Sequence, residues 1–566
     1  MMKFKLRCPR WISLFLVFIQ FPNLSTALEL DSRQLLSKMT LEQKVGQLFL
    51  IGFPQTELDQ KLRSHIQKNK LAGFLLFKRN ILDPHQLVKL NKALFEVSTK
   101  NTGVLPILAV DQEGGFVNRV PIRPSTPHAI SVGISKSAPL SLALGNEIGK
   151  ILNSLGFNMN LAPVLDLANH QKKSFIGVRA FGSDPTLVGN IGSAYSAGLL
   201  KNHVVPTAKH FPGLGDTVDD PHLSSIVRKD SAKSLLENDL VPFKMYSQLE
   251  GEKAIMLSHM IYPQLDDSLL PAPFSKKIIH QWLRQELGFE GVVLTDDLHM
   301  KASSDKNTLS EGAFKALEAG VDMVMLSWSF VEQEKTVQRI VSAYKNAELP
   351  LNELDEKVLR ILRMKNFIAQ STFLPHENLE KILSSLEMDA IEQRLFKTKL
   401  ELIKDQFSLQ ADKSVCAYSS KGTFLTDFRT QLNLRSRTFQ MHPQLTQTTL
   451  EKSLAENSCQ LNILTVYNRT QAQLAVRLSE SSRKSLILLN MGSIAFLRDT
   501  TPFLARVETL SHYKGAGQDL ARFLNEKINT FRPEDQYRPE LARSRDVESR
   551  SSRRPSSQRP ISSRPQ

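Results

Sequence analysis

Eight short apolar runs rich in β-branched residues recur between Leu28 and Pro350, and each is followed by a longer segment with helical periodicity. Eight strand–helix units are what a (β/α)8 TIM barrel requires; a doubly wound open sheet has the same alternation, and the strand count does not exclude it. No glycine-rich nucleotide-binding fingerprint follows any run. We therefore expect an α/β barrel over residues 28–350. The runs are Leu48–Phe53, Leu71–Phe77, Leu105–Asp111, Phe157–Leu167, Val204–His210, Ala254–Met260, Val292–Asp296 and Val321–Ser327.

Three further segments follow the expected barrel. Residues 351–410 are mostly helical in pattern and are expected to form a linker. Residues 411–532 alternate strand-like and helical patterns, which predicts a smaller α/β domain of sandwich type with strands at Val415–Ser419, Leu461–Tyr467 and Leu486–Leu489. Residues 533–566 are largely Arg, Ser and Pro, so we expect a disordered tail.

The first 27 residues have the three parts of a secretory signal peptide. Basic residues up to Arg10 precede an apolar run from Trp11 to Phe21, and Ser25-Thr-Ala27 offers the small residues of a cleavage site. The apolar run is too short for a permanent membrane span, although an uncleaved anchor is an alternative. We expect export, to the periplasm where the source has two membranes and to the cell surface or medium otherwise.

The formal net charge of +15 is concentrated at the two ends of the chain. Residues 1–27 carry four basic residues and no acid, and residues 538–566 carry eight Arg against three acids. Because the body between them has an ordinary charge balance, we do not expect nucleic-acid binding. The basic tail could make weak contact with an anionic envelope; a solvated tail without a partner is the simpler interpretation. We expect a monomer.

Cleavage of the signal peptide would remove Cys8 and leave Cys416 and Cys459. We expect these two to be small buried hydrophobes, since a fold of this size has a core and needs no covalent link. A disulfide formed in an oxidising compartment is the alternative.

Polar side chains follow several of the apolar runs, at the point where each strand should end or in the loop just beyond it. In a (β/α)8 barrel such residues converge on one mouth, where reactive groups lie. Each has a simpler explanation when taken alone: the aspartates could cap helices, and the Lys-His pair could be a buried structural pair. Asp166 is expected to be a structural acid. The candidates are Asp111, Arg179, Lys209, His210, His259 and Asp296.

The segment after Lys209-His210 is rich in Gly, Pro and Asp and is therefore expected to be a loop over the mouth. Within it, Asp220 and His222 are two residues apart, so the carboxylate could accept the imidazole N–H and suit His222 to proton transfer near neutral pH. A surface turn is the alternative for this spacing. No zinc-binding spacing of His or Cys is present, and we expect neither a metal nor a cofactor.

Four motifs, in order along the barrel, resemble those of glycoside hydrolase family 3, in its β-N-acetylhexosaminidase (NagZ-like) branch. The resemblance implies an exo-acting retaining β-N-acetylglucosaminidase that acts on peptidoglycan fragments without a cofactor. The motifs are Asp111-Gln-Glu-Gly-Gly115, Arg179-Ala-Phe-Gly-Ser-Asp-Pro185, Lys209-His-Phe-Pro-Gly213 with Asp220-x-His222, and Leu294-Thr-Asp-Asp-Leu-His-Met300.

The resemblance also implies a role for each candidate. Asp296, rather than Asp297 beside it, would attack the anomeric carbon and form a covalent glycosyl-enzyme. His222, oriented by Asp220, would act as the acid and then the base. The hydroxyls of the terminal sugar would be bound by Asp111, Arg179, Lys209, His210 and His259.

The sequence departs from the usual pattern of that branch in three places: Leu214 stands where His is common, Phe116 stands where Arg is common, and the loop after His222 lacks the usual proline. Three alternatives remain at this point. A β-glucosidase or β-xylosidase of the same family usually takes its acid from the second domain. An N-acetylglucosaminide phosphorylase would use phosphate in place of water, which a histidine acid/base does not repel. A non-catalytic cell-wall-binding protein would keep the pocket without turnover.

Overall fold

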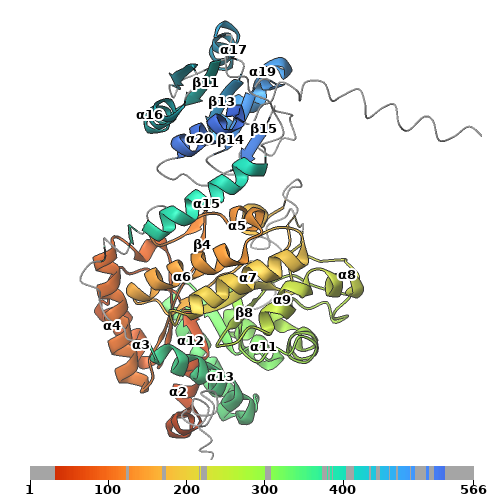
Figure 1. Cartoon of the computed structure of the whole chain (residues 1–566). Coiled ribbons are helices and arrows are strands. Elements are labelled where there is room, and N and C mark those ends of the chain that lie inside the picture. Colours follow the sequence, from red (N-terminus) through yellow and green to blue (C-terminus); the bar gives the residue numbers. More distant parts are fainter. Residues whose placement is uncertain are drawn as a thin grey trace, which may run out of the picture. The chain divides into compact units, whose positions relative to one another are not determined.

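The computed structural model forms two compact units, one up to Lys399 and the other mostly beyond Leu400, and each is described by itself (Figure 1). The expected signal peptide and basic tail lie outside the described residues. The described residues are 32–122, 126–168, 174–215, 217, 226–299, 308–371, 379, 383–384, 386–402, 414–432, 435–441, 446–457, 459, 461–466, 469–484, 486–490, 505–508 and 516–529.

The first unit is a closed barrel of eight parallel strands in the order β1-β10-β9-β8-β7-β6-β3-β2. Closure excludes the doubly wound open sheet and confirms the barrel, because β1 pairs in parallel with both β10 and β2. Each expected apolar run coincides with one strand, and only β7 and β9 extend one residue past the end of their runs. The strands are β1 (Phe49–Ile51), β2 (Gly73–Leu76), β3 (Ile107–Val110), β6 (Met159–Asn160), β7 (Val205–Phe211), β8 (Ala254–Leu257), β9 (Val292–Asp297) and β10 (Met323–Leu326).

Helices between the strands cover the outside of the barrel (Figure 1), and their starts follow from local sequence. Thr40 forms the expected capping box with Gln43, and Asp83 caps the helix that Pro84 begins. The expected amphipathic helix after Ser275 is wound as a π-helix. The helices are α2 (Leu41–Gln47), α3 (Gln60–Lys68), α4 (Pro84–Thr102), α5 (Ala129–Ser135), α6 (Ala138–Ser154), α7 (Pro185–Leu200), α8 (Ala232–Glu237), α9 (Leu240–Ser247), η4 (Lys277–Glu286), α11 (Leu309–Ala319) and α12 (Phe330–Lys345), with 3-10 turns η1 (Lys78–Asn80), η2 (Gly177–Arg179) and η3 (Ala272–Phe274). None of the helices described in either unit has the length and apolar character needed to span a membrane.

The helix α13 (Leu351–Ala369) belongs to the barrel unit, although its residues were expected to lie in a linker. Its apolar face, including Leu354, Val358 and Ile361, is fully buried in the barrel core. The following helix α15 (Leu386–Leu402) also contributes Ile391 to that core. The helical pattern alone does not distinguish a bridging helix from one that packs on a neighbour, which accounts for the difference.

A buried ion cluster ties α13 to the amino ends of the strands. Asp322, which directly precedes β10, accepts hydrogen bonds from Arg284 Nη2 at 2.7 Å, from the Val293 backbone N–H at 2.8 Å and from Arg360 Nε at 2.9 Å. Burial alone would raise the pKa of Asp322, but the two guanidinium groups hold it below its usual value. The cluster therefore stabilises the end of the barrel opposite the strand-end candidates.

Lys365 on α13 is also fully buried at this end. Its Nζ donates to Gln47 Oε1 at 2.6 Å and to the carbonyl of Ala72 at 2.9 Å. Because both partners are neutral, burial lowers the pKa of Lys365 from 10.5 to about 7.

The second unit is a five-stranded sheet in the order β12-β11-β13-β14-β15. The three expected strands are present, and two more were not expected. The edge strand β12 carries Arg435, Arg437 and Gln440, so it lacks the apolar run by which the others were recognised. The elements are β11 (Ser414–Ser419), α16 (Gly422–Gln431), β12 (Arg435–Gln440), α17 (Gln447–Glu456), β13 (Leu461–Val466), α18 (Arg469–Arg477), α19 (Glu480–Lys484), β14 (Leu486–Asn490), β15 (Ala505–Glu508) and α20 (Ala516–Asn529).

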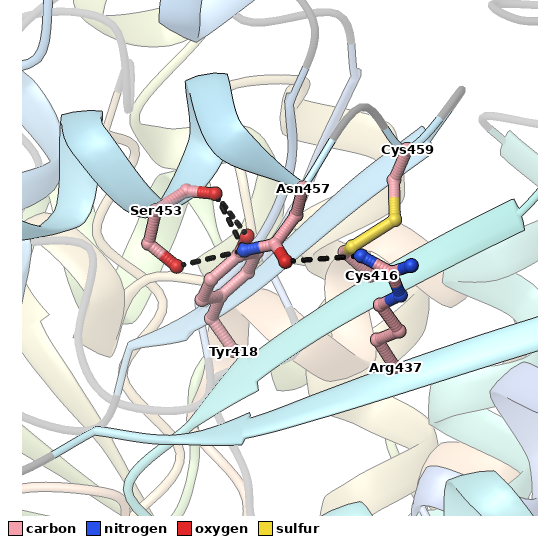
Figure 2. Close-up of a disulfide and its surroundings, with 6 residues drawn as sticks. All are labelled: Cys416, Tyr418, Arg437, Ser453, Asn457 and Cys459. Atoms are coloured by element: carbon pink, nitrogen blue, oxygen red, sulfur yellow. Dashed lines mark hydrogen bonds between the residues drawn. A yellow bond between two sulfur atoms is a disulfide. The ribbon is translucent and has the colours of Figure 1, made fainter.

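Cys416 and Cys459 form a disulfide (Figure 2), so the expectation of two unpaired hydrophobes is wrong. Cys416 lies on β11 and Cys459 just before β13, and these neighbouring strands pair Val415 with Leu461. This register brings the two Cα atoms within 5.8 Å, a separation that a disulfide spans. The pairing could not be derived from sequence because it depends on which strands are neighbours.

We predict that Lys365→Met flattens the pH dependence of stability. Between pH 7 and pH 10.5, Lys365 is mostly neutral in the folded protein and protonated in the unfolded chain, so unfolding takes up a proton. The stability of wild type therefore rises with pH across this range. From pH 7 to pH 9, the free energy of unfolding of wild type should therefore increase by about 2 kcal/mol more than that of the variant. Chemical denaturation at both pH values measures this, with the exposed Lys229→Met as control. Parallel pH dependences for wild type and Lys365→Met would contradict it.

Candidate active site

A cavity of about 460 Å³ lies at the carboxyl ends of the barrel strands. This volume is in the range of small-molecule sites. Five of the six strand-end candidates line it: Asp111, Arg179, Lys209, His210 and Asp296. The other lining residues are Leu75, Phe77, Arg79, Glu113, Val117, Arg119, Leu161, Met256, Asp297, Met325, Ser327 and Trp328.

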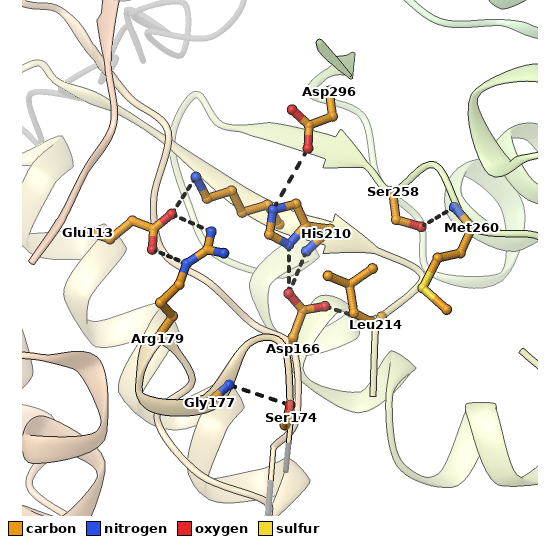
Figure 3. A network of polar contacts seen from close by, with 12 residues as sticks. Glu113, Asp166, Ser174, Gly177, Arg179, His210, Leu214, Ser258, Met260 and Asp296 are labelled. Atoms are coloured by element: carbon orange, nitrogen blue, oxygen red, sulfur yellow. Dashed lines mark hydrogen bonds and ion pairs between the residues drawn. The ribbon is translucent and has the colours of Figure 1, made fainter. Parts of the chain in front are cut away.

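Glu113 is the centre of a buried ion cluster in this cavity (Figure 3). Its carboxylate accepts two hydrogen bonds from Arg179, from Nε at 2.7 Å and from Nη2 at 2.8 Å. Lys209 Nζ lies 2.7 Å from the same carboxylate and donates to Asp111 Oδ1 at 2.9 Å. Residues from three consecutive strand–loop units are thereby joined by charge-assisted bonds.

Each member of the cluster keeps its charge because of its neighbours. Burial alone would raise the pKa of Glu113, but Arg179 and Lys209 hold it far below its usual value. Burial alone would lower the pKa of Lys209, but Asp111 and Glu113 raise it. The side chains of Glu113 and Lys209 are 4% and 3% exposed. The ion cluster therefore forms the fixed base, or floor, of the cavity rather than a solvated surface.

The glycine pair of the first motif places Glu113. Glu113 lies on the short strand β4 (Gln112–Gly114), which turns into β5 (Val117–Asn118). Gly115 has a φ of +56°, and a Cβ there would lie 2.0 Å from His128 Nδ1. Only glycine fits this turn without displacing His128.

His210 lies between two carboxylates (Figure 3). Its Nδ1 is 2.7 Å from Asp166 Oδ2, and its Nε2 is 4.0 Å from Asp296 Oδ2. Asp166 also accepts the backbone N–H groups of His210 and Leu214. Since an ionised carboxylate only accepts, Asp166 fixes the proton on Nδ1 and turns Nε2 toward the cavity. Asp166, expected to be structural, therefore orients a cavity residue, and Leu214 contributes a backbone contact to it.

Asp296 and Asp297 are adjacent at the end of β9 but have different surroundings. Asp297 accepts from the backbone N–H of Ser327, from the Ser327 hydroxyl and from the His299 ring, which hold it in place. Asp296 Oδ1 accepts the backbone N–H of Asp297 at 2.8 Å, and its side chain is 19% exposed. A carboxylate that is anchored at one oxygen and faces the cavity is suited to act as a nucleophile.

The remaining candidates lie elsewhere. His259 is not among the residues that line the cavity; it is buried, and its Nε2 is 3.2 Å from the carbonyl oxygen of Asp297 at the end of β9. Asp220 and His222 lie outside the described residues. Among the described residues, no group of three or more His, Cys, Asp or Glu side chains is placed to hold a metal ion.

Three further residues of the cavity were not among the candidates chosen from the sequence as polar groups near strand ends. Glu113 lies two residues beyond Asp111 in the first motif, and only its contacts distinguish it from an ordinary loop acid. Arg79 and Trp328 follow β2 and β10. Their position after a strand could have identified them, but an aromatic residue and a lone arginine carry no motif.

Comparisons with known proteins show which family the barrel resembles in sequence and in fold. The model of the glycosyl hydrolase family 3 N-terminal domain matches residues 40–364. The chain is 29% identical to beta-hexosaminidase A of Pseudoalteromonas piscicida over 373 residues, which is 59% of this chain and 62% of that protein. It is 35% identical to a beta-hexosaminidase of Alkalilimnicola ehrlichii over 287 residues, which is 49% of this chain and 79% of the relative.

A solved structure is similar over most of its length. The family 3 β-N-acetylglucosaminidase of Paenibacillus sp. str. FPU-7 superposes with a TM-score of 0.68 at 26% identity. The match covers 87% of this chain and 97% of that one.

We predict that Glu113→Gln destabilises the protein by about 3 kcal/mol at neutral pH, because two buried cations lose their shared counter-charge. The contribution of Glu113 should be complete above its ordinary pKa of 4.5 and decline as the pH falls below it. Thermal and chemical unfolding at pH 7 and pH 4 measure both effects. Glu318→Gln, at an exposed position on α11, is the control. An equal, small effect of both substitutions would show that the cluster does not organise the cavity.

Proposed function

The chain belongs to glycoside hydrolase family 3 and is a glycosidase; on this premise we propose that it is an exo-acting, retaining β-N-acetylglucosaminidase. Its substrates would be peptidoglycan fragments with a terminal N-acetylglucosamine. The observation that carries the proposal is a cavity with a fixed, charged floor into which the Asp296 carboxylate faces. The names of the similar proteins support the choice of sugar.

In the first step, an Asp296 oxygen attacks the anomeric carbon. The new C1–O bond forms as the glycosidic C1–O bond breaks, and the electron pair of that bond goes to the leaving oxygen. An anionic Asp296 also stabilises the positive charge that develops on the sugar ring.

His222, oriented by Asp220, would supply the proton transfers. The protonated imidazole gives its proton to the leaving oxygen in the first step. The neutral imidazole then takes a proton from water, which attacks C1 and releases Asp296. A histidine replaces the second carboxylate of most retaining glycosidases in this role.

The floor of the cavity would hold the sugar by its hydroxyl groups. Arg179 and Lys209 can donate hydrogen bonds, Asp111 can accept them, and His210 presents its Nε2 nitrogen as an acceptor. Because the floor is buried and its charges are paired, it can form directional hydrogen bonds to the sugar hydroxyls without attracting a free ion.

Export of the enzyme is part of the proposal, because peptidoglycan lies outside the cytoplasmic membrane. The signal-peptide pattern of residues 1–27 supports it. The Cys416–Cys459 disulfide supports it independently, since disulfides form and persist in oxidising compartments.

We predict that the mature protein hydrolyses p-nitrophenyl N-acetyl-β-glucosaminide much faster than the matching glucoside and xyloside. Asp296→Ala should lower kcat by about a thousandfold or more, because it removes the nucleophile. Azide should restore turnover in this variant and yield the α-glycosyl azide. Asp297→Asn should alter the structure at β9 without gaining rescue by azide.

Other outcomes separate the alternatives. A sugar phosphate formed only with added phosphate would identify a phosphorylase. Faster turnover of the glucoside or xyloside would reassign the sugar. A folded wild type that binds muropeptides but turns over no substrate would leave a binding protein.

A further inference from the structure

Trp328 is a large aromatic residue left in solvent at the edge of the cavity. It lines the cavity and yet is 50% exposed, whereas Glu113 and Lys209 at the floor are almost completely buried. An exposed indole beside a sugar-sized cavity is a surface on which a further ring can stack.

Arg79 holds this indole. The Arg79 guanidinium lies 3.8 Å from the centre of the Trp328 ring and 4.2 Å from that of Phe77. Its Nε donates to the carbonyl of Phe53 at 3.1 Å and its Nη2 to the carbonyl of Ser327 at 3.0 Å. Backbone anchoring together with cation–π contact fixes one side of the indole before any ligand arrives.

The backbone of Trp328 is fixed as well. The buried side chain of Gln333 donates to the carbonyls of Gly52, Leu326 and Trp328 at 2.9, 3.0 and 3.4 Å. The next residue, Ser329, has a φ of +61° and caps α12 by accepting the Glu332 N–H. The indole of Trp328 is therefore preorganised as a stacking platform, so that stacking of a ligand ring on it costs little conformational entropy.

The burial gradient identifies the part of the substrate that meets Trp328. In an exo-acting site the terminal sugar enters a closed floor, and the group that leaves extends toward solvent. Here the floor is formed by residues at or after the ends of β3, β6 and β7, Asp296 is the second-last residue of β9, and Trp328 follows β10. Trp328 follows the strand next to β9 in the barrel and is far more exposed than the floor, so a group that extends from the floor past Asp296 into solvent would be within its reach.

We propose that Trp328, positioned by Arg79, is the platform for the leaving group and determines specificity for one that is itself a sugar ring. This inference rests on the proposed function. The apolar face of a pyranose would stack on the side of the indole that Arg79 does not cover. Trp328 would contribute nothing to the binding of a leaving group that is too small to reach it.

The test compares two substrates that share the terminal sugar. N-Acetyl-β-glucosaminyl fluoride has no leaving-group ring, whereas N,N′-diacetylchitobiose has a second sugar. Trp328→Ala should lower kcat/KM for the disaccharide by about tenfold and leave that for the fluoride within about twofold. Trp328→Phe should restore part of the loss, and Arg79→Met should reproduce part of it. Equal losses on both substrates, or none on the disaccharide, would overturn the proposal.

Binding gives a readout that does not require turnover. In a Trp282→Phe, Asp296→Asn background the mature protein retains Trp328 as its single tryptophan, since the third tryptophan of the sequence, Trp11, lies in the expected signal peptide. Diacetylchitobiose should change this fluorescence, and N-acetylglucosamine alone should not. Fluorescence that responds equally to both ligands, or to neither while chitobiose binds by calorimetry, contradicts the platform. If wild type hydrolyses neither substrate, the proposed function fails, and this binding measurement still decides the role of Trp328.

Discussion

The carboxylate of Glu113, shared between Arg179 and Lys209, is the interaction on which the site depends. Burying charges is costly unless each is paired and hydrogen-bonded, and here each cation has a carboxylate partner within 2.9 Å. The cluster connects the ends of β3, β6 and β7, so it fixes the relative positions of residues that the sequence separates widely. A floor built in this way is rigid, polar and electrically balanced, and in the proposed mechanism Asp296 supplies the reacting charge.

The two ends of the barrel use buried charge for different purposes. At the amino ends, Asp322 joins α13 to η4 and β9. At the carboxyl ends, the ion cluster and the Asp166–His210 pair face an open cavity. Similar ion pairs therefore stabilise the amino end of the barrel and line the cavity at its carboxyl end.

Much of the barrel and part of the candidate site could be predicted from the sequence. The barrel followed from eight apolar runs, and five of the cavity residues followed from their position at strand ends. Long-range partners could not be predicted: the role of Glu113 depends on a residue 66 positions away, and the disulfide depends on the pairing of β11 with β13. Helix α13 was assigned to a linker because periodicity reports a buried face but not its partner. Strand β12 was missed because polar residues occupy this edge.

The central claim is that Asp296 forms a covalent bond to the sugar. A 5-fluoro N-acetylglucosaminyl fluoride tests it most directly, since fluorine at C5 slows both steps while fluoride at C1 leaves readily. The trapped protein is digested with trypsin, and the peptide of residues 285–301 contains both adjacent aspartates. Fragmentation by mass spectrometry should place the sugar on Asp296. A sugar on Asp297, or an active enzyme that accumulates no adduct and releases the product with inverted configuration, would contradict the account.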